Sequence, residues 1–143
     1  MNVESLLRSK GHGVATVAPG ETTAEAAAML AREKIGALVI SEDGQSVLGI
    51  LSERDIAQGL AVHGGGLGDL AVRELMTRNV VTCAPEDEVT QLMAVMTERR
   101  IRHLPVVKGG VLCGIVSIGD VVKQRLGELE HEADAMREYI VGA

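Results

Sequence analysis

The sequence predicts an α+β fold in which one small unit, of order β-α-β-β-α, occurs twice and is followed by a C-terminal helix. The main observation is an internal repeat. Residues 14–19 return as 80–85 at an offset of 66, and residues 49–55 return as 114–120 at an offset of 65. The one-residue difference falls between two expected turns, where chains tolerate insertions and deletions. The unit is longer than a solenoid repeat, so it is a small domain used twice.

Each unit is expected to begin with a short strand and a helix. Residues 80–83 form an apolar and β-branched run that ends before Pro85, which predicts a strand. Side chains then recur at i, i+3, i+4 and i+7, the pattern of the inner face of a helix. These are Val89, Leu92, Met93 and Met96 in the second unit, and Thr23, Ala26, Ala27 and Leu30 in the first. Thr22 and Glu25 predict a capping box at the start of the first of these helices.

A hairpin and a second helix complete each unit. Glycine-containing turns join strands expected at 38–40 and 47–51, and again at 104–107 and 111–116. Residues 63–68, His-Gly-Gly-Gly-Leu-Gly, lie between the units and are expected to form a flexible loop or linker end. They do not fit a dinucleotide-binding fingerprint, because that motif needs a preceding strand and a following helix at fixed spacing.

The tail is expected to be helical from residue 120 to about 139. Its apolar side chains are spaced 4-3-4-3-4, a heptad-like stripe. They are Val122, Leu126, Leu129, Ala133, Met136 and Ile140. Such a stripe needs a surface to pack against, in its own domain or in a second subunit, and we expect a homodimer. The chain divides into a first unit at 1–66, a second at 67–124 and a tail at 125–143.

Composition limits the possible partners. The formal net charge is −6 and Tyr139 is the one aromatic residue, so neither phosphate neutralisation nor base stacking favours nucleic acid. No apolar run is long enough to span a membrane. The first ten residues lack the hydrophobic region of a secretory signal, so we expect a cytoplasmic protein.

The reactive residue types do not gather in the sequence. Cys83 and Cys113 have neither CxxC spacing nor a nearby ligand cluster, which indicates two reduced thiols, with a regulatory disulfide as the alternative. The four histidines are too scattered to assemble a metal site or a His-based catalytic triad. We therefore expect no metal, no catalytic residues and no enzymatic activity.

The strongest local signal is the repeated segment Gly-Ile-x-Ser-x-x-Asp. Ser52 and Ser117 can be N-caps, with Asp55 and Asp120 reaching back to them from position N3. A helix N-terminus with a serine hydroxyl also suits an anionic or polyhydroxyl ligand, and an Asp one turn later can accept two ribose hydroxyls. The two interpretations are compatible.

The second signal is a basic cluster at residues 99–103. Arg99 and Arg100 can be cations near a helix C-terminus. Arg102 and His103 begin the next strand and can project into a cleft, where an arginine would hold a phosphate with two hydrogen bonds. The first unit has Gly36 and Ala37 at the matching places, so two such clefts should differ in charge.

These motifs together resemble a stand-alone, bacterial-type pair of CBS domains, also called a Bateman module. The resemblance covers residues 14–124 and the leading segments 3–7 and 72–77, and it includes Ile-Arg-His-Leu-Pro-Val-Val at 101–107. It implies two clefts related by pseudo-two-fold symmetry, in each of which the first strand of one repeat faces the Ser-x-x-Asp turn of the other. One cleft would combine Thr16, Val17, Gly36 and Ala37 with Ser117 and Asp120. The other would combine Val80, Thr82, Arg102, His103, Leu104 and Pro105 with Ser52, Arg54 and Asp55.

The resemblance also implies a function. It suggests a non-catalytic regulatory module that senses an adenine nucleotide, AMP, ADP, ATP or NAD(H), and signals to a separate partner protein. Asp would hold the ribose and basic residues the phosphate, a pattern from which the cleft containing Gly36 departs. One alternative is a structural dimerisation module in which the Ser-x-x-Asp turns are only caps. Another is a thiol-linked redox regulator, which requires Cys83 or Cys113 to be exposed.

Overall fold

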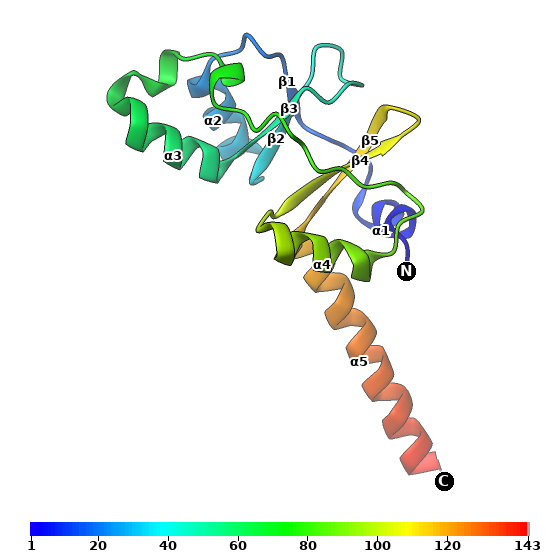
Figure 1. Ribbon diagram of the computed structural model, residues 1–143. Helices are drawn as coiled ribbons and strands as arrows, with labels where there is room; N and C mark the ends of the chain where they lie inside the picture. Colours follow the sequence, from blue (N-terminus) through cyan, green and yellow to red (C-terminus); the bar gives the residue numbers. More distant parts are fainter. Residues whose placement is uncertain (143) are drawn as a thin grey trace.

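The computed structural model describes residues 1–142 and contains two small α/β halves from which one long helix projects (Figure 1). The first half contains β1 (Thr16–Val17), α2 (Thr23–Glu33), β2 (Ala37–Ile40), β3 (Gly49–Ser52) and α3 (Glu53–His63). The second contains α4 (Val89–Arg99), β4 (His103–Lys108), β5 (Val111–Ser117) and α5 (Ile118–Gly142). Outside this repeat lie α1 (Val3–Lys10) and the 3₁₀ turns η1 (Gly64–Asp69) and η2 (Val72–Glu74). The predicted α+β class, the two repeats and the C-terminal helix are confirmed.

The two sheets differ by one strand. In the first half β1 pairs parallel to β2, with Thr16 opposite Val39, and β2 pairs antiparallel to β3. In the second half β4 and β5 form a two-stranded hairpin. The strand predicted at residues 80–83 is wrong, since in this segment only Cys83 forms a bridge, parallel to Val106.

Pro105 explains the missing strand. In the first half the N–H of Val39 donates to the carbonyl of Ala15 at 3.1 Å. Pro105 occupies the position of Val39 in the second half and has no N–H to donate, so the matching bond to Val81 cannot form. The segment from 80 to 82 is therefore released from the sheet.

Two further local predictions need correction. The loop expected at residues 63–68 is instead the end of α3 followed by η1, and the side chain of Leu67 is buried against Gly59. An apolar anchor of this kind fixes a glycine-rich segment that composition alone suggests is flexible. Half of the expected capping box is present: Thr22 accepts the N–H of Glu25 at 3.2 Å, but its own N–H donates to the Glu21 carboxylate.

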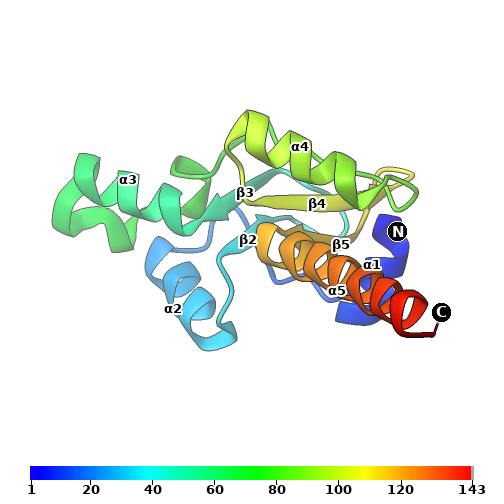
Figure 2. The same ribbon diagram turned by 90° about the horizontal axis from the view of Figure 1, so that it is seen from below.

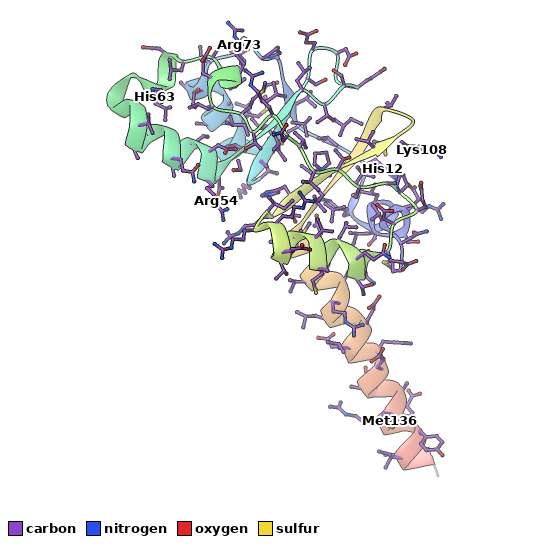
Figure 3. The ribbon with its side chains drawn as sticks, viewed as in Figure 1. His12, Arg54, His63, Arg73, Lys108 and Met136 are labelled. Carbon is purple, nitrogen blue, oxygen red and sulfur yellow. The ribbon has the colours of Figure 1, made fainter. Side chains whose placement is uncertain are left out.

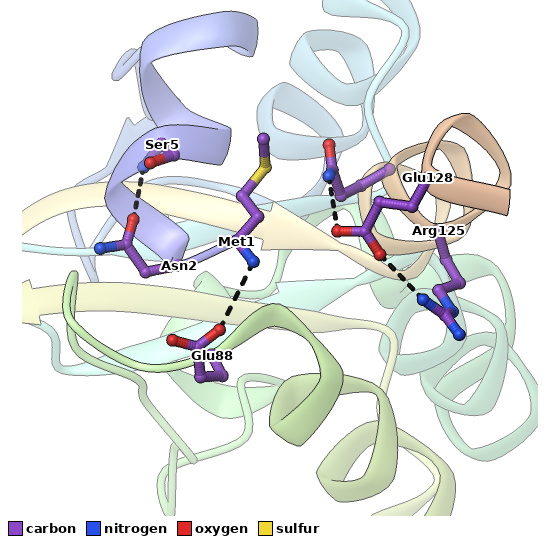
Figure 4. A network of polar contacts seen from close by, with 7 residues as sticks. Met1, Asn2, Ser5, Glu88, Arg125 and Glu128 are labelled. Atoms are coloured by element: carbon purple, nitrogen blue, oxygen red, sulfur yellow. Dashed lines mark hydrogen bonds and ion pairs between the residues drawn. The ribbon is translucent and has the colours of Figure 1, made fainter. Parts of the chain in front are cut away.

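Each half completes its core with a segment that precedes the other half in sequence. Val3, Leu6 and Leu7 of α1 are buried in the core of the second half. A Cβ at Gly114 would lie 2.7 Å from Leu7 Cδ1, so β5 needs a glycine where α1 crosses it. The amino group of Met1 also approaches the Glu88 carboxylate at 3.5 Å (Figure 4).

The first half is completed in the same way. Val72 is buried in its core, with Leu75 and Met76 packed against it. Gly49 of β3 stands where Gly114 stands in β5, and a Cβ there would collide with the Met76 side chain. The two halves therefore exchange their leading segments, and each core is completed by the segment that precedes the other half.

Helix α5 contacts the body as far as Glu128, and its remainder projects away from the body (Figures 1 and 2). Val121 is buried in the second core, whereas Leu126 and Met136 are 54% and 59% exposed. Among residues 1–142, the apolar stripe thus lacks a covering surface of its own chain. The homodimer and the domain limits 1–66, 67–124 and 125–143 stay predictions.

Candidate functional site

Two clefts lie between the halves, each combining a Ser-x-x-Asp turn from one half with segments of the other. We call them the Asp55 cleft, with a volume of about 220 Å³, and the Asp120 cleft, with a volume of about 960 Å³. The Asp55 cleft includes Ser52, Arg54 and Asp55 together with Val80, Arg102 and His103. The Asp120 cleft includes Ser117 and Asp120 together with Thr16, Gly36 and Ala37. The structure thus brings these eleven predicted residues together in the two groups that the resemblance implied.

The turn in the Asp55 cleft is a complete capping box. The N–H of Ser52 donates to Asp55 Oδ2 at 2.8 Å, and the N–H of Asp55 donates to Ser52 Oγ at 3.3 Å. The other carboxylate oxygen, Oδ1, accepts a long bond of 3.3 Å from the Thr77 hydroxyl. Because a carboxylate oxygen can accept two hydrogen bonds, Oδ1 keeps capacity for a ligand while Oδ2 caps α3.

Three arginines surround this cleft: Arg54, Arg100 and Arg102. Arg54 lies on the first turn of α3, at the end nearest the second half (Figure 3), and its Nη1 donates to the carbonyl of Arg100 at 3.0 Å. Arg100 is the C-cap of α4 and has a left-handed backbone with φ of 56°. Against the acidic Glu53 and Asp55, three guanidinium groups make this cleft net positive in an acidic chain.

The turn in the Asp120 cleft is capped in the same way but holds an additional ion pair. Asp120 Oδ2 accepts the N–H of Ser117 at 2.9 Å and the Lys10 ammonium at 2.6 Å. Lys10 also donates to the carbonyl of Ile115 at 2.8 Å. Burial alone would raise the pKa of Asp120, but the bonds from Lys10 and Ser117 outweigh it and hold that pKa below its ordinary value.

Gly36 and Ala37 replace the basic pair in this cleft, but basic side chains reach it from other positions. Lys10 enters from α1, and Lys34 lines the cleft from the C-cap of α2, where its φ is 55°. Lys34 stands at the position that Arg100 occupies in the second half, so the repeat offset contained this signal. No sequence signal placed Lys10, because it belongs to the segment exchanged between the halves.

Gly36, Glu53, Arg102 and His103 line both clefts, and Gly36 and His103 meet between them. A Cβ at Gly36 would lie 3.0 Å from His103 Nε2, so the imidazole occupies the space that a larger residue would fill. Burial lowers the pKa of His103, against the opposite effects of Glu53 and Asp120. The ring is therefore predominantly neutral at pH 7 and can exchange hydrogen bonds with groups on either side.

Four predicted residues do not line either cleft. Val17, Leu104 and Pro105 are buried, while Thr82 is exposed outside both clefts. Alternation along a strand turns Val17 and Leu104 into the cores, away from the clefts. Thr77 and Asn79, just before the second repeat, line the Asp55 cleft but were not among the predicted residues.

The thiols lie in environments that suppress their reactivity. Cys83 is buried, and burial together with Asp87 and Cys113 raises its pKa to about 12. Cys113 is half-buried, its Sγ donates to the Val106 carbonyl at 3.4 Å, and burial raises its pKa as well. Because the thiolate is the reactive form, this arrangement disfavours the thiol-linked redox interpretation.

The described residues also bear on metal binding and on membrane insertion. His12 and His63 lie at opposite ends of the body (Figure 3), and residues 1–142 contain no group of three or more His, Cys, Asp or Glu side chains placed to hold a metal ion. Within the same range, none of the helices combines the length and the apolar character that crossing a membrane requires.

Comparison with known proteins gives consistent results. The CBS domain model matches residues 7–62 and 72–127. The chain is 34% identical to the CBS domain-containing protein YhcV of Bacillus subtilis over 79% of both chains. It is 36% identical to the mitochondrial CBS domain-containing protein CBSX3 of Arabidopsis thaliana, over 85% of this chain, and spans about three fifths (61%) of that relative.

Solved structures agree. The CBS-domain containing protein ATU1752 of Agrobacterium tumefaciens is 45% identical, with a TM-score of 0.84 over 87% of this chain and 92% of that one. The CBS domain pair of protein MJ0100, in complex with 5′-methylthioadenosine and S-adenosyl-L-methionine, is 27% identical, with a TM-score of 0.78 over 90% and 98% of the two chains. Such pairs are regulatory modules, and some bind adenosine-containing ligands. The two matched domains cover most of the sequence, and the chain belongs to the CBS-domain family as a tandem pair.

Proposed function

We propose that the Asp55 cleft binds an adenine nucleotide, AMP, ADP, ATP or NAD(H), and that the chain is a non-catalytic module that signals its occupancy to a separate partner protein. The observation that carries this proposal is the juxtaposition of a carboxylate with acceptor capacity and three arginines in one cleft. A nucleotide needs this pair of chemistries, an acceptor for the ribose hydroxyls and cations for the phosphate.

The lining residues fit the parts of such a ligand. Asp55 Oδ1 would accept ribose hydroxyls, and the N-terminus of α3 adds favourable dipole potential for an anion. Arg102, with Arg100 and Arg54 beside it, would hold the phosphate. Ile50, Val80 and Ile101 supply aliphatic walls for the base in a cleft without Phe, Tyr or Trp.

Charge distinguishes among adenosine ligands. The related MJ0100 pair is seen with 5′-methylthioadenosine and S-adenosyl-L-methionine, neither of which carries a phosphate. Three guanidinium groups in the Asp55 cleft favour a ligand with negative charge over the sulfonium of S-adenosyl-L-methionine. We therefore expect AMP to bind more tightly than 5′-methylthioadenosine.

The route from binding to signalling follows from the position of the cleft. Asp55 belongs to the first half, whereas Val80, Ile101 and Arg102 come from the second. A ligand that contacts both halves favours one relative arrangement of them, and a partner can distinguish the occupied from the empty arrangement.

Isothermal titration calorimetry with AMP, ADP, ATP, NADH, 5′-methylthioadenosine and S-adenosyl-L-methionine tests this function. We expect micromolar-range affinity for at least one nucleotide. At a ligand concentration about 100 times its Kd, binding should stabilise the fold by about 2.7 kcal/mol, seen as a higher melting temperature. Absent heats together with unchanged melting for every nucleotide would favour the structural dimerisation module instead.

A further inference from the structure

The free part of α5 carries an apolar face that the body leaves uncovered. Leu126, Leu129, Met136 and Ile140 are 54%, 45%, 59% and 67% exposed. The face that α5 turns to the body is a different one, since Val121 is buried and neighbouring side chains line a small cavity against Met1 and α4. Successive residues of an α-helix are about 100° apart, so the stripe lies to one side of that contact, open to solvent.

We propose that α5 forms a parallel, in-register, two-stranded coiled coil with α5 of a second copy of this chain. The stripe supplies alternating a and d positions. Leu126, Ala133 and Ile140 fall at a, and Val122, Leu129 and Met136 fall at d. Gly127 falls at b, outside the seam, where no side chain is needed for packing. The proposal does not depend on nucleotide binding.

The charges beside the stripe select the second copy and its orientation. Arg125 and Glu132 occupy g positions, and Glu130 and Arg137 occupy e positions. In a parallel pair each g residue faces the e residue five positions later in the other helix. Arg125 then meets Glu130 of the partner subunit and Glu132 meets Arg137 of the partner subunit, and the two-fold axis doubles both pairs.

An antiparallel pair with full overlap produces the opposite result. Its e–e and g–g contacts bring Lys123 against Arg137, Glu130 against Glu130 and Glu132 against Glu132, all of like charge. Sliding the helices by one heptad restores opposite charges but leaves two of the six stripe side chains uncovered. The parallel register alone among these arrangements buries the whole stripe and pairs opposite charges.

Contacts within the chain do not prevent this pairing. Arg125 approaches Glu128 at 3.0 Å (Figure 4), and Arg137 approaches Asp134 at 3.6 Å. All four side chains are partly or largely exposed, and exposed ion pairs contribute little to stability. Both arginines can therefore turn from these contacts to the carboxylates of the second helix.

A charge-exchange experiment tests whether the charges beside the stripe hold the two helices together. One variant carries Arg125→Glu and Arg137→Glu, and the other carries Glu130→Arg and Glu132→Arg. In the parallel pair every g–e contact becomes repulsive in either variant alone, so light scattering should show the wild-type mass halved. Mixing the two variants makes all four contacts attractive again and should restore the dimer. Dimers in either variant alone, or monomers in the mixture, overturn the proposal.

The matched control is the pair Leu129→Asp and His131→Asp. Both residues are exposed on the same helix, so neither change disturbs a core. Leu129 lies in the stripe and His131 at f, on the opposite side, so only Leu129→Asp should halve the mass. A monomeric wild type, or equal loss in the two variants, contradicts the proposal.

Disulfide trapping gives an independent readout of register. In the parallel pair Met136 lies opposite Met136 of the partner subunit, so Met136→Cys should cross-link to itself under mild oxidation with diamide. In the antiparallel pair it lies opposite Leu126 instead. Cross-linking that requires a mixture of Leu126→Cys and Met136→Cys chains overturns the parallel register, and oxidised wild type controls for Cys83 and Cys113.

Discussion

The Asp55 and Asp120 clefts contain the same serine, aspartate and helix N-terminus, but the aspartates differ in what already occupies them. Asp55 caps α3 and keeps one oxygen with only a long bond to Thr77, in a cleft with three arginines. Asp120 also accepts the Lys10 ammonium at 2.6 Å, in a cleft more than four times as large. A repeated motif therefore does not imply two equal sites, because the segments that surround each copy decide how much of the carboxylate is available.

Among the substitutions considered, replacement of Arg102 should have the largest effect on AMP affinity. Arg102→Ala should weaken AMP about 10- to 150-fold, because a charge-assisted hydrogen bond contributes about 1.5–3 kcal/mol. Adenosine, without a phosphate, should bind almost as before. The measurement is calorimetric titration of both ligands. Arg99→Ala is the control, since Arg99 ends α4 shortly before Arg102 and lines neither cleft. Equal losses in the two variants would contradict a phosphate role.

Replacing the two aspartates separates ligand binding from capping. Asp55→Asn should weaken AMP and adenosine alike by about 5- to 150-fold, because the amide turns a donor toward the ribose, a mismatch of about 1–3 kcal/mol. Its capping contribution is at most about 1 kcal/mol. Asp120→Asn should cost less affinity and more stability, because it removes the partner of Lys10. Titrations and melting curves of both variants measure these losses. A larger loss of affinity in Asp120→Asn than in Asp55→Asn would assign the nucleotide to the Asp120 cleft instead.

Replacing Lys10 should make the stability of the chain less dependent on pH. The native pKa of Asp120 lies below its unfolded value, so the pair contributes above the unfolded pKa and is lost as the pH falls through the native one. Lys10→Met should cost about 0.5–1 kcal/mol at pH 7, and the difference from wild type should shrink below about pH 4. Urea unfolding at pH 7 and pH 3.5 measures it. A difference that is constant across this range would attribute the loss to packing of α1.

The smallest expected effects concern the two left-handed C-caps, Lys34 and Arg100, which occupy matching positions in the two halves. Lys34→Gly and Arg100→Gly should each stabilise the unliganded protein by about 0.5 kcal/mol, since glycine adopts positive φ without strain but is more flexible when unfolded. Only Arg100→Gly should also weaken AMP, because Arg100 lines the Asp55 cleft. Thermal melts with and without AMP compare them, and an equal loss of AMP response would contradict the assignment of the nucleotide to this cleft.

Much of the site could be read from the sequence because it is built from short segments. The Ser-x-x-Asp turns and Arg102 with His103 follow strands, and strand ends at helix N-termini are placed by local geometry. The placement of Val17 and Leu104 outside the clefts has a local cause as well, since their strand neighbours face the clefts while they face the cores. The strand predicted at residues 80–83 is absent because Pro105, in the neighbouring strand, has no N–H to donate.

By itself the sequence determined the repeat, the helices and hairpins within it, the two capping turns and the stripe on α5, because each depends on neighbours within one or two turns or strands. Only the tertiary structure decided that α1 closes the core of the second half and that Lys10 meets Asp120, 110 residues away. Those contacts depend on which surface a leading segment packs against. Small glycines at 49 and 114 make room for that packing, but no periodic pattern records which segment will occupy the space.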